Sequence, residues 1–212
     1  MVVTTSFDFD DALRARIQDN LARLIGPTPV APAGHRRAGV ALIVAPREDG
    51  EAAFLLTRRA PRMGAHAGQQ ALPGGKVDAD ETDEEAARRE TAEEIGLNLT
   101  PDALLGRLDP YATRSGFVMA PFVYWSEHAG DFAFSAHEVQ SVRRVPLSDL
   151  FVQEEPVLLP GDTPDRPILR LPLGERFIHA PTAALLYQFR EVALAGRYLS
   201  VAHFDQPDFA RR

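Results

Sequence analysis

The acidic segment from residue 78 to residue 94 places the strongest constraint on what this chain can fold into. Nine of its seventeen residues are acidic and two are arginines, so it alone carries the formal net charge of −7 of the 212-residue chain. Outside this segment the chain has 21 basic and 21 acidic residues and is neutral. Any function assigned to the chain must account for this local concentration of charge.

The pattern of this segment predicts a helix over residues 82–95. Thr82 and Glu85 have the spacing of a capping box, in which each side chain accepts a hydrogen bond from the other residue's backbone. Gly96 follows the last apolar position and fits a helix C-cap, where glycine is favoured.

Three glutamates of this predicted helix form a candidate metal site. Glu90 and Glu94 are four residues apart and Glu93 lies three from Glu90, so all three are expected on one side of the helix. Repulsion between such glutamates destabilises a helix by about 0.2–0.5 kcal/mol per pair. A cation bound between them would make their proximity favourable. Oxygen ligands without thiolates suit Mg²⁺ or Mn²⁺. The preceding glycine-rich loop can approach a ligand closely, which makes the Gly74 carbonyl a further candidate ligand.

A longer motif, G-x5-E-x7-R-E-x-x-E-E-x-G, runs from Gly75 to Gly96. Arg89 cannot lose its proton, so we assign it to orienting Glu81 or another carboxylate. The alternative is a solvated acidic helix, but neutralising partners at i,i+4 spacing are nearly absent. Seven fixed positions would match by chance in fewer than about one window in 10⁶.

This motif resembles the box of the Nudix hydrolase family, which residues 75–97 match at every fixed position. Thr91 stands at a variable position where the family usually has an aliphatic residue, and its methyl group can still pack. The resemblance implies an α/β/α sandwich with a mixed central sheet, in which the box forms a loop, a helix and a second loop. It also implies hydrolysis of a diphosphate linked to another moiety, with Mg²⁺ or Mn²⁺ bound by Glu90, Glu93 and Glu94.

The rest of the chain predicts a single α/β domain around this helix. Residues 1–35 are expected to form an N-terminal helix and a proline-containing lead-in, and residues 36–212 one domain with a C-terminal helix and tail. Strands are expected at 38–45, 52–57, 103–108, 117–125 and 139–145, a helical turn at 147–151, and a helix at 182–194. Residues 58–80 are expected to be irregular, as are residues 156–172 apart from a short strand near 168–171.

The loop before the box resembles the extra signature of the coenzyme A pyrophosphatase branch of this family. The resemblance rests on residues 55–60, 66–69 and 72–75, with Gly64 and Leu72 where that signature usually has arginine and phenylalanine. Arginines near a metal site can also bind phosphate in bidentate fashion, although any one of them could instead pair with the acidic helix. The loop also contains His66, and a single histidine is more often structural than functional. The candidate substrate-binding residues are Arg58, Arg59, Arg62, His66, Gln69 and Lys76.

The resemblance implies a water nucleophile whose proton is removed by a glutamate. Glu93 and Glu138 are the candidate bases, and Glu138 could instead complete the metal ligands. Coenzyme A would be cleaved to 4′-phosphopantetheine and 3′,5′-ADP. Two alternatives remain open: hydrolysis of another nucleoside diphosphate derivative, such as ADP-ribose, NADH or a dinucleoside polyphosphate, and a non-catalytic binding module with the same fold.

Composition excludes several other classes of protein. The chain has no cysteine, which excludes disulfides, thiol catalysis and thiolate-bound metals. No apolar run approaches the roughly 20 residues that span a bilayer, and residues 1–11 lack the pattern of a secretory signal. We therefore expect a cytoplasmic protein without nucleic-acid or membrane partners. The resemblance to the Nudix family implies that its substrate is a small nucleotide-type molecule. Its helical ends could support a homodimer.

Overall fold

The computed structural model describes residues 6–23, 34–61, 68–153, 155–174 and 176–207. Its elements in chain order are α1 (Asp11–Ala22), β1 (Arg36–Pro46), β2 (Ala52–Arg59), β3 (Gln70–Ala71), β4 (Gly74–Lys76), α2 (Asp83–Ile95), η1 (Pro101–Ala103), β5 (Leu104–Arg107), β6 (Tyr111–Ala112), β7 (Phe117–Trp125), β8 (Val139–Pro146), η2 (Leu147–Phe151), β9 (Val157–Leu159), β10 (Ile168–Leu173), β11 (Arg176–His179), α3 (Thr182–Gln188) and η3 (Phe189–Leu194). The predicted helix at 182–194 is therefore α3 followed directly by η3, one turn of π-helix.

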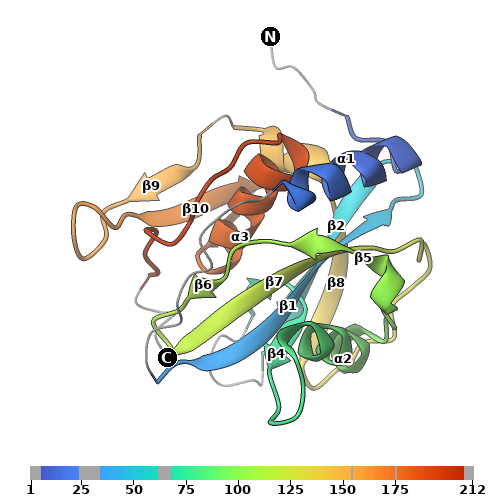
Figure 1. Ribbon diagram of the computed structural model, residues 1–212, viewed down its shortest axis with the longest axis horizontal. Coiled ribbons are helices and arrows are strands. Elements are labelled where there is room, and N and C mark those ends of the chain that lie inside the picture. The colour runs from blue at the N-terminus through green and yellow to red at the C-terminus, as the bar shows by residue number, and fades with distance from the viewer. Residues whose placement is uncertain (1–5, 24–33, 62–67, 154, 175, 208–212) are drawn as a thin grey trace.

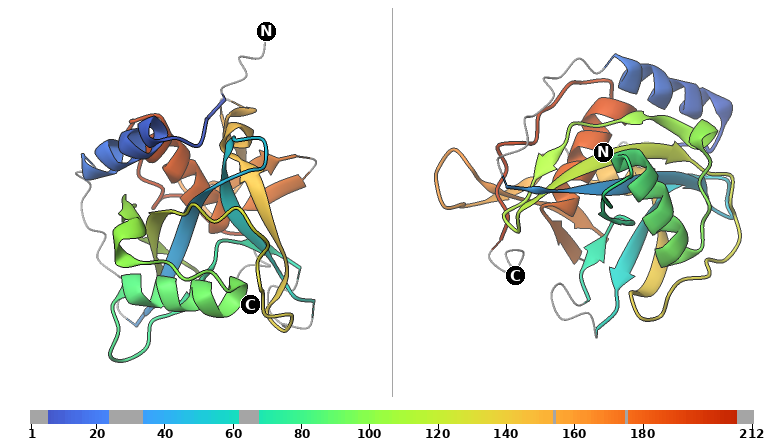
Figure 2. Two further views of the ribbon diagram at one scale, coloured as in Figure 1. Left: turned by 90° about the vertical axis from the view of Figure 1, so that its right-hand side faces the viewer. Right: turned by 60° about the horizontal axis from the view of Figure 1, so that its bottom comes forward.

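A mixed sheet of eight strands forms the centre of the molecule (Figure 1). Its main path runs β3-β2-β1-β7-β5, with β8 paired to β2, β4 to β1 and β6 to β7. Strands β1 and β7 run parallel, and all other pairs in this sheet are antiparallel. Helix α2 covers one face, whereas α1 and α3 lie over the other, as two views agree (Figures 1 and 2). This arrangement confirms the expected α/β/α sandwich with a mixed central sheet.

The alternation of side chains along β1 divides the core into two layers. Val40, Leu42 and Val44 pack in the larger cluster, which also holds the buried residues of α1 and α3. Ala41 and Ile43 point the opposite way, into the cluster beneath α2. A continuous apolar run is what a strand covered on both faces requires, because successive residues point to opposite faces.

Helix α2 begins and ends where the sequence predicts. The capping box between Thr82 and Glu85 forms in both directions, and Gly96 ends the helix in the left-handed conformation with φ of 71°. The helix lies directly on the backbone of β1, because a Cβ added to Gly39 would stand 2.0 Å from the carbonyl oxygen of Asp83. This close approach fixes where the acidic residues of α2 stand relative to the sheet.

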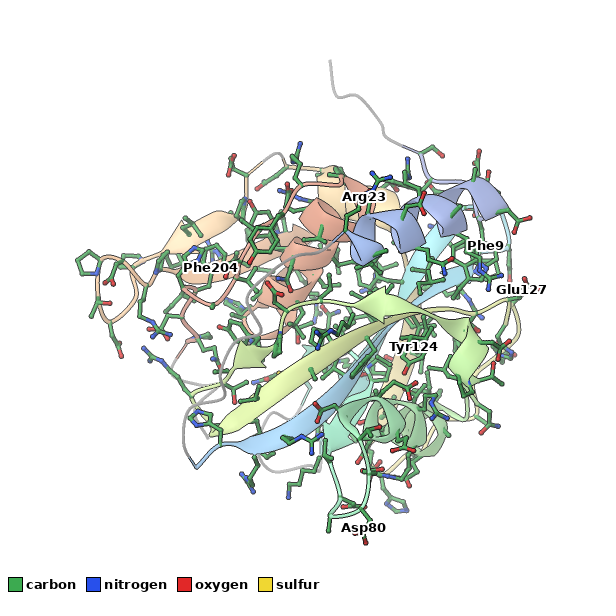
Figure 3. All side chains as sticks on the ribbon, in the orientation of Figure 1. Phe9, Arg23, Asp80, Tyr124, Glu127 and Phe204 are labelled. Atoms are coloured by element: carbon green, nitrogen blue, oxygen red, sulfur yellow. The ribbon has the colours of Figure 1, made fainter. Side chains whose placement is uncertain are left out.

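A buried tyrosine adds a polar contact between α2 and the sheet. Tyr124 lies on β7 (labelled in Figure 3). Its hydroxyl donates a hydrogen bond of 2.7 Å to a carboxylate oxygen of Glu84. We expect Tyr124→Phe to lower the free energy of unfolding by about 1 kcal/mol, because the ring still packs while the hydrogen bond is lost. Thermal unfolding should show a decrease in Tm of about 2–4 °C. A variant as stable as the wild type would show that this contact contributes nothing.

Two segments that were expected to be irregular contain strands. Residues 58–80 include β3 and β4, and β4 pairs with β1 from Ala38 opposite Lys76 to Val40 opposite Gly74. The strand expected near residues 168–171 is present as β10, and it pairs with β11 and with β9, which was not expected, in a second sheet of order β11-β10-β9. Strands β3, β4 and β9 are only two or three residues long, so pairing with a neighbour defines them rather than local sequence. Strand β6 was also not expected, for the same reason.

In the part of the chain that the structure describes, no helix is long and apolar enough to cross a membrane.

Candidate functional site

The last glutamate of α2 is buried beside the glycine-rich loop. Glu94 is 6% exposed, and the backbone N–H of Gly74 donates a hydrogen bond of 3.2 Å to its Oε2. On its other side, Nη1 of Arg59, at the end of β2, lies 3.9 Å from Oε1. Burial raises the pKa of Glu94 to about 7, although the Gly74 N–H and the charge of Arg59 act to lower it. A positive charge added near this buried carboxylate would therefore stabilise its ionised form.

Two further carboxylates act on Glu94. The charges of Glu90 and Glu138 both raise the pKa of Glu94 further. The pKa of Glu90 is itself raised, mainly by burial and in part by the charge of Glu138. The fold therefore brings Glu138, from the turn before β8, into the electrostatic reach of both helix glutamates. We call Glu90, Glu94 and Glu138 the carboxylate group.

The loop glycine that starts the sequence motif makes room for one of these carboxylates. A Cβ added to Gly75 would stand 2.3 Å from the carboxyl carbon of Glu90. Glycine is thus required here for the space it leaves, since its φ is not in the left-handed region.

Arg89 is the central cation on the outer side of α2. Its Nη2 and Nε donate to the two carboxylate oxygens of Glu81, at 2.7 and 3.2 Å, in the bidentate geometry typical of strong ion pairs. Its Nη1 donates to Glu90 at 2.9 Å and to Glu93 at 3.2 Å. The bond from Arg89 is the main cause that lowers the pKa of Glu81. These contacts are the ones that the expected orienting role requires.

More acidic residues of α2 form ion pairs with arginines of the same helix than the sequence indicated. Nε of Arg88 donates a hydrogen bond of 2.8 Å to Glu84, at i,i+4 spacing. Arg89 and Glu93 form a second pair at the same spacing. The expectation that such pairs are nearly absent was therefore wrong. Neither arginine contacts Glu94, which instead faces Arg59.

The three helix glutamates do not point at a common position. Glu93 is exposed and bound to Arg89, whereas Glu94 is buried on the sheet side. The cause is helix geometry: with about 100° between successive residues, Glu93 and Glu94 lie on opposite sides of Glu90. Among the described residues, no three acidic or histidine side chains are placed closely enough to form a ready-made metal cage.

The carboxylate group nevertheless has the donor chemistry that a hard cation requires. Its ligand atoms are all oxygens, its members repel one another, and the loop at Gly74 brings backbone against Glu94. Glu90 and Glu94, with Glu138 close by, are therefore the residues that could hold Mg²⁺ or Mn²⁺. Coordination by Glu90 would compete with its hydrogen bond to Arg89.

The predicted substrate-binding residues do not form one cluster. Arg59 faces α2 and Glu94, whereas Arg58 lines a pocket elsewhere. Gln69 accepts a hydrogen bond of 2.9 Å from the backbone of Arg59 through its own carbonyl and lines a neighbouring pocket. Lys76 is exposed at the end of β4, and its carbonyl accepts a bond from Arg89. The remaining two candidates, Arg62 and His66, lie outside the described residues.

Three further residues could not be singled out from the sequence, one at this site and two at the pocket of Arg58. Gly39 allows the close packing of α2, but a glycine inside an apolar run carries no sign of the helix that will cross it. Arg143 and Arg176 line the same pocket as Arg58. Only strand pairing could have indicated Arg143, because β8 places it opposite Leu56 of β2.

Comparison with known proteins gives a consistent result. The family model described as NUDIX domain matches residues 35–171. "Uncharacterized Nudix hydrolase NudL" of Yersinia pestis (strain Pestoides F) is 35% identical over 130 residues, which cover 56% of this chain and 64% of that protein. "Nudix hydrolase 3" of Caenorhabditis elegans is 36% identical over 106 residues, covering 48% of this chain and 44% of that protein. This chain thus spans less than two thirds of either relative.

A solved structure supports the fold. The Nudix hydrolase RenU from M. smegmatis superposes with a TM-score of 0.50 at 24% identity, covering 79% of this chain and 91% of that one. At this level of identity the similarity concerns the arrangement of the chain alone.

Proposed function

The chain belongs to the NUDIX domain family, and from this we propose that it is a divalent-metal-dependent pyrophosphohydrolase acting on coenzyme A or its derivatives. The products would be 4′-phosphopantetheine and 3′,5′-ADP. The observation that carries the proposal is the carboxylate group, in which Glu90, Glu94 and Glu138 act on one another beside the loop at Gly74 and Gly75.

In the proposed hydrolysis, different residues would bind the metal, bind the diphosphate and position the carboxylates. Glu90 and Glu94 would hold Mg²⁺ or Mn²⁺, with the Gly74 carbonyl as a further ligand. The bound ion would supply electrostatic stabilisation of the charge that develops on the diphosphate. Arg59 stands next to Glu94 with its positive charge, where a diphosphate oxygen could bind. Arg89 would position Glu81 and Glu90 without exchanging a proton.

Glu138 is the better placed of the two candidate bases. It is exposed, so water can reach it, and its charge acts on both Glu90 and Glu94. Glu93 is instead tied to Arg89 by a hydrogen bond of 3.2 Å on the outer side of the helix. We therefore assign the removal of the water proton to Glu138 and keep Glu93 as the second candidate.

The choice of coenzyme A rests on the loop signature and on the basic residues around it. Residues 55–60, 66–69 and 72–75 resemble the signature of that branch, and coenzyme A offers phosphates for several arginines. A second candidate class is ADP-ribose, NADH or a dinucleoside polyphosphate. The departures from the signature at Gly64 and Leu72 favour it.

A substrate panel tests the proposal directly. The protein is incubated with Mg²⁺ and coenzyme A, ADP-ribose, NADH or a dinucleoside polyphosphate, and the products are separated by chromatography. We expect preferential cleavage of coenzyme A, which stops when EDTA removes the metal. Preferential cleavage of another compound would overturn the substrate, and absence of cleavage of all of them would favour a binding module.

Gly75→Ala tests the placement of Glu90. The new methyl group would overlap the Glu90 carboxylate, which lies at the end of a flexible side chain and can move away. We therefore expect turnover to fall by about 10–100-fold, as when a group that orients a metal ligand is lost, with little change in Tm. Activity equal to that of the wild type would contradict a role for Glu90 at its present position.

A further inference from the structure

A basic site lies on the face of the sheet opposite to α2 and the carboxylate group. Arg58, Arg143 and Arg176 line one pocket of about 240 Å³. Its remaining lining residues are neutral: Leu56, Thr57, Gln70 and Ser141. Among the residues that the structure describes, three arginines and no acidic side chain line this pocket.

Strand pairing explains why two of these arginines meet. On β2, Arg58 is two residues from Leu56, so both point to the same face, the one covered by α3. On β8, Ser141 stands opposite Arg58 and Arg143 opposite Leu56. Arg58 and Arg143 are therefore diagonal neighbours on one face of an antiparallel pair, about 7–8 Å apart at their backbones. Their neighbour Arg59 points to the other face, towards Glu94.

The third arginine comes from the second sheet. Arg176 is the first residue of β11 and lines both this pocket and an adjoining one. Gln70 also lines both pockets. The adjoining pocket of about 200 Å³ is lined in part by Gln69, Phe177 and His179. The two pockets adjoin at Gln70 and Arg176. Arginines line the first, and the lining of the second includes an aromatic ring and an imidazole.

The charges at the basic end are not matched by nearby carboxylates. No carboxylate of the described residues lies within 4 Å of the guanidinium groups of Arg58, Arg143 or Arg176. Arg143 acts by its charge on Asp149 in η2, which is beyond ion-pair distance. Nε of Arg58 donates a long hydrogen bond of 3.4 Å to the carbonyl of Gly68, which leaves its terminal nitrogens to other partners. A dianion with several oxygens would relieve the repulsion between three cations.

We propose that Arg58, Arg143 and Arg176 bind a phosphate monoester of the substrate, separate from the diphosphate that is cleaved. This inference rests on the proposed function: Arg58 and Arg59 are adjacent in β2, so a molecule that crosses the end of this strand can present its diphosphate to Arg59 and a second phosphate to Arg58. The 3′-phosphate of coenzyme A is such a group. The pocket would therefore determine specificity for substrates that carry it.

The test compares coenzyme A with 3′-dephospho-coenzyme A. In Arg143→Gln and in Arg176→Gln, we expect the ratio of kcat/KM for coenzyme A to that for the dephospho form to fall about tenfold, because one charge-assisted contact is lost. The change should appear in KM rather than kcat, as for a contact made equally in ground and transition states. Arg107→Gln, an exposed arginine of β5 at the far edge of the sheet, is the charge-matched control and should leave the ratio unchanged.

Each outcome either supports or overturns the subsite. An unchanged ratio in both pocket variants, or an equal fall in Arg107→Gln, overturns it while leaving the proposed hydrolysis intact. If the wild type cleaves neither compound, the proposed function fails, and calorimetric binding of 3′,5′-ADP against 5′-AMP decides the subsite alone. Tighter binding of 3′,5′-ADP that is lost in Arg143→Gln supports the subsite, and equal affinities overturn it.

Discussion

Glu94→Gln is expected to lower turnover by about 10²–10⁴-fold while the protein stays folded. Glutamine has nearly the same shape and can still accept the hydrogen bond from the N–H of Gly74, so packing at this buried position is kept. The negative charge that would hold a divalent cation is lost. Turnover of coenzyme A with saturating Mg²⁺ measures the effect, and a titration with Mg²⁺ shows whether a higher metal concentration restores activity.

The stability of Glu94→Gln separates loss of chemistry from loss of fold. Burial raises the pKa of Glu94 to about 7, above its usual value of 4.5, so ionising this side chain costs stability as the pH rises from about 4.5 to 7. Without metal at pH 8, the variant should therefore be at least as stable as the wild type. Glu127→Gln makes the same chemical change at an exposed residue after β7 and should leave turnover unchanged (Figure 3). Wild-type activity in Glu94→Gln would exclude Glu94 as a metal ligand.

The local part of the site could be predicted from sequence because its signals are local. The capping box at Thr82 and the C-cap at Gly96 involve residues three or four positions apart, and the structure has both. The long strands β1 and β7 were equally predictable, since continuous apolar runs reflect burial on both faces. The α/β architecture followed from these elements.

What could not be predicted depends on contacts between distant segments. Helical spacing could not show that the sheet and the loop at Gly74 bury Glu94. The basic residues Arg58 and Arg59 are adjacent in sequence, yet a strand sends them to opposite faces. The partners of Arg58 come from β8 and β11, more than 80 residues further along the chain, so only the fold brings them together.

Gly39→Ala is expected to destabilise the protein much more than Gly75→Ala does. The new Cβ would stand 2.0 Å from the carbonyl oxygen of Asp83 and 2.6 Å from the backbone nitrogen of Ala87. Both atoms belong to the backbone of α2, so no side-chain rotation can relieve the overlap and the helix must move away from β1. We expect the free energy of unfolding to fall by about 1–3 kcal/mol and Tm by about 2–12 °C.

The same displacement should also impair catalysis, because α2 carries Glu90 and Glu94. A shift of about 1 Å in catalytic groups can cost about 100-fold in rate, so turnover should fall even below the melting transition. Gly130→Ala is the matched control: its Cβ would come no closer than 3.4 Å, to the ring of His128, and its φ is not in the left-handed region, so stability should change by less than about 0.5 kcal/mol. If Gly39→Ala were as stable and active as Gly130→Ala, this result would contradict the close packing of α2 on the backbone of β1. The position of Glu90 and Glu94 relative to Gly74 and Arg59 would then have to be revised as well, because the contact between α2 and β1 determines it.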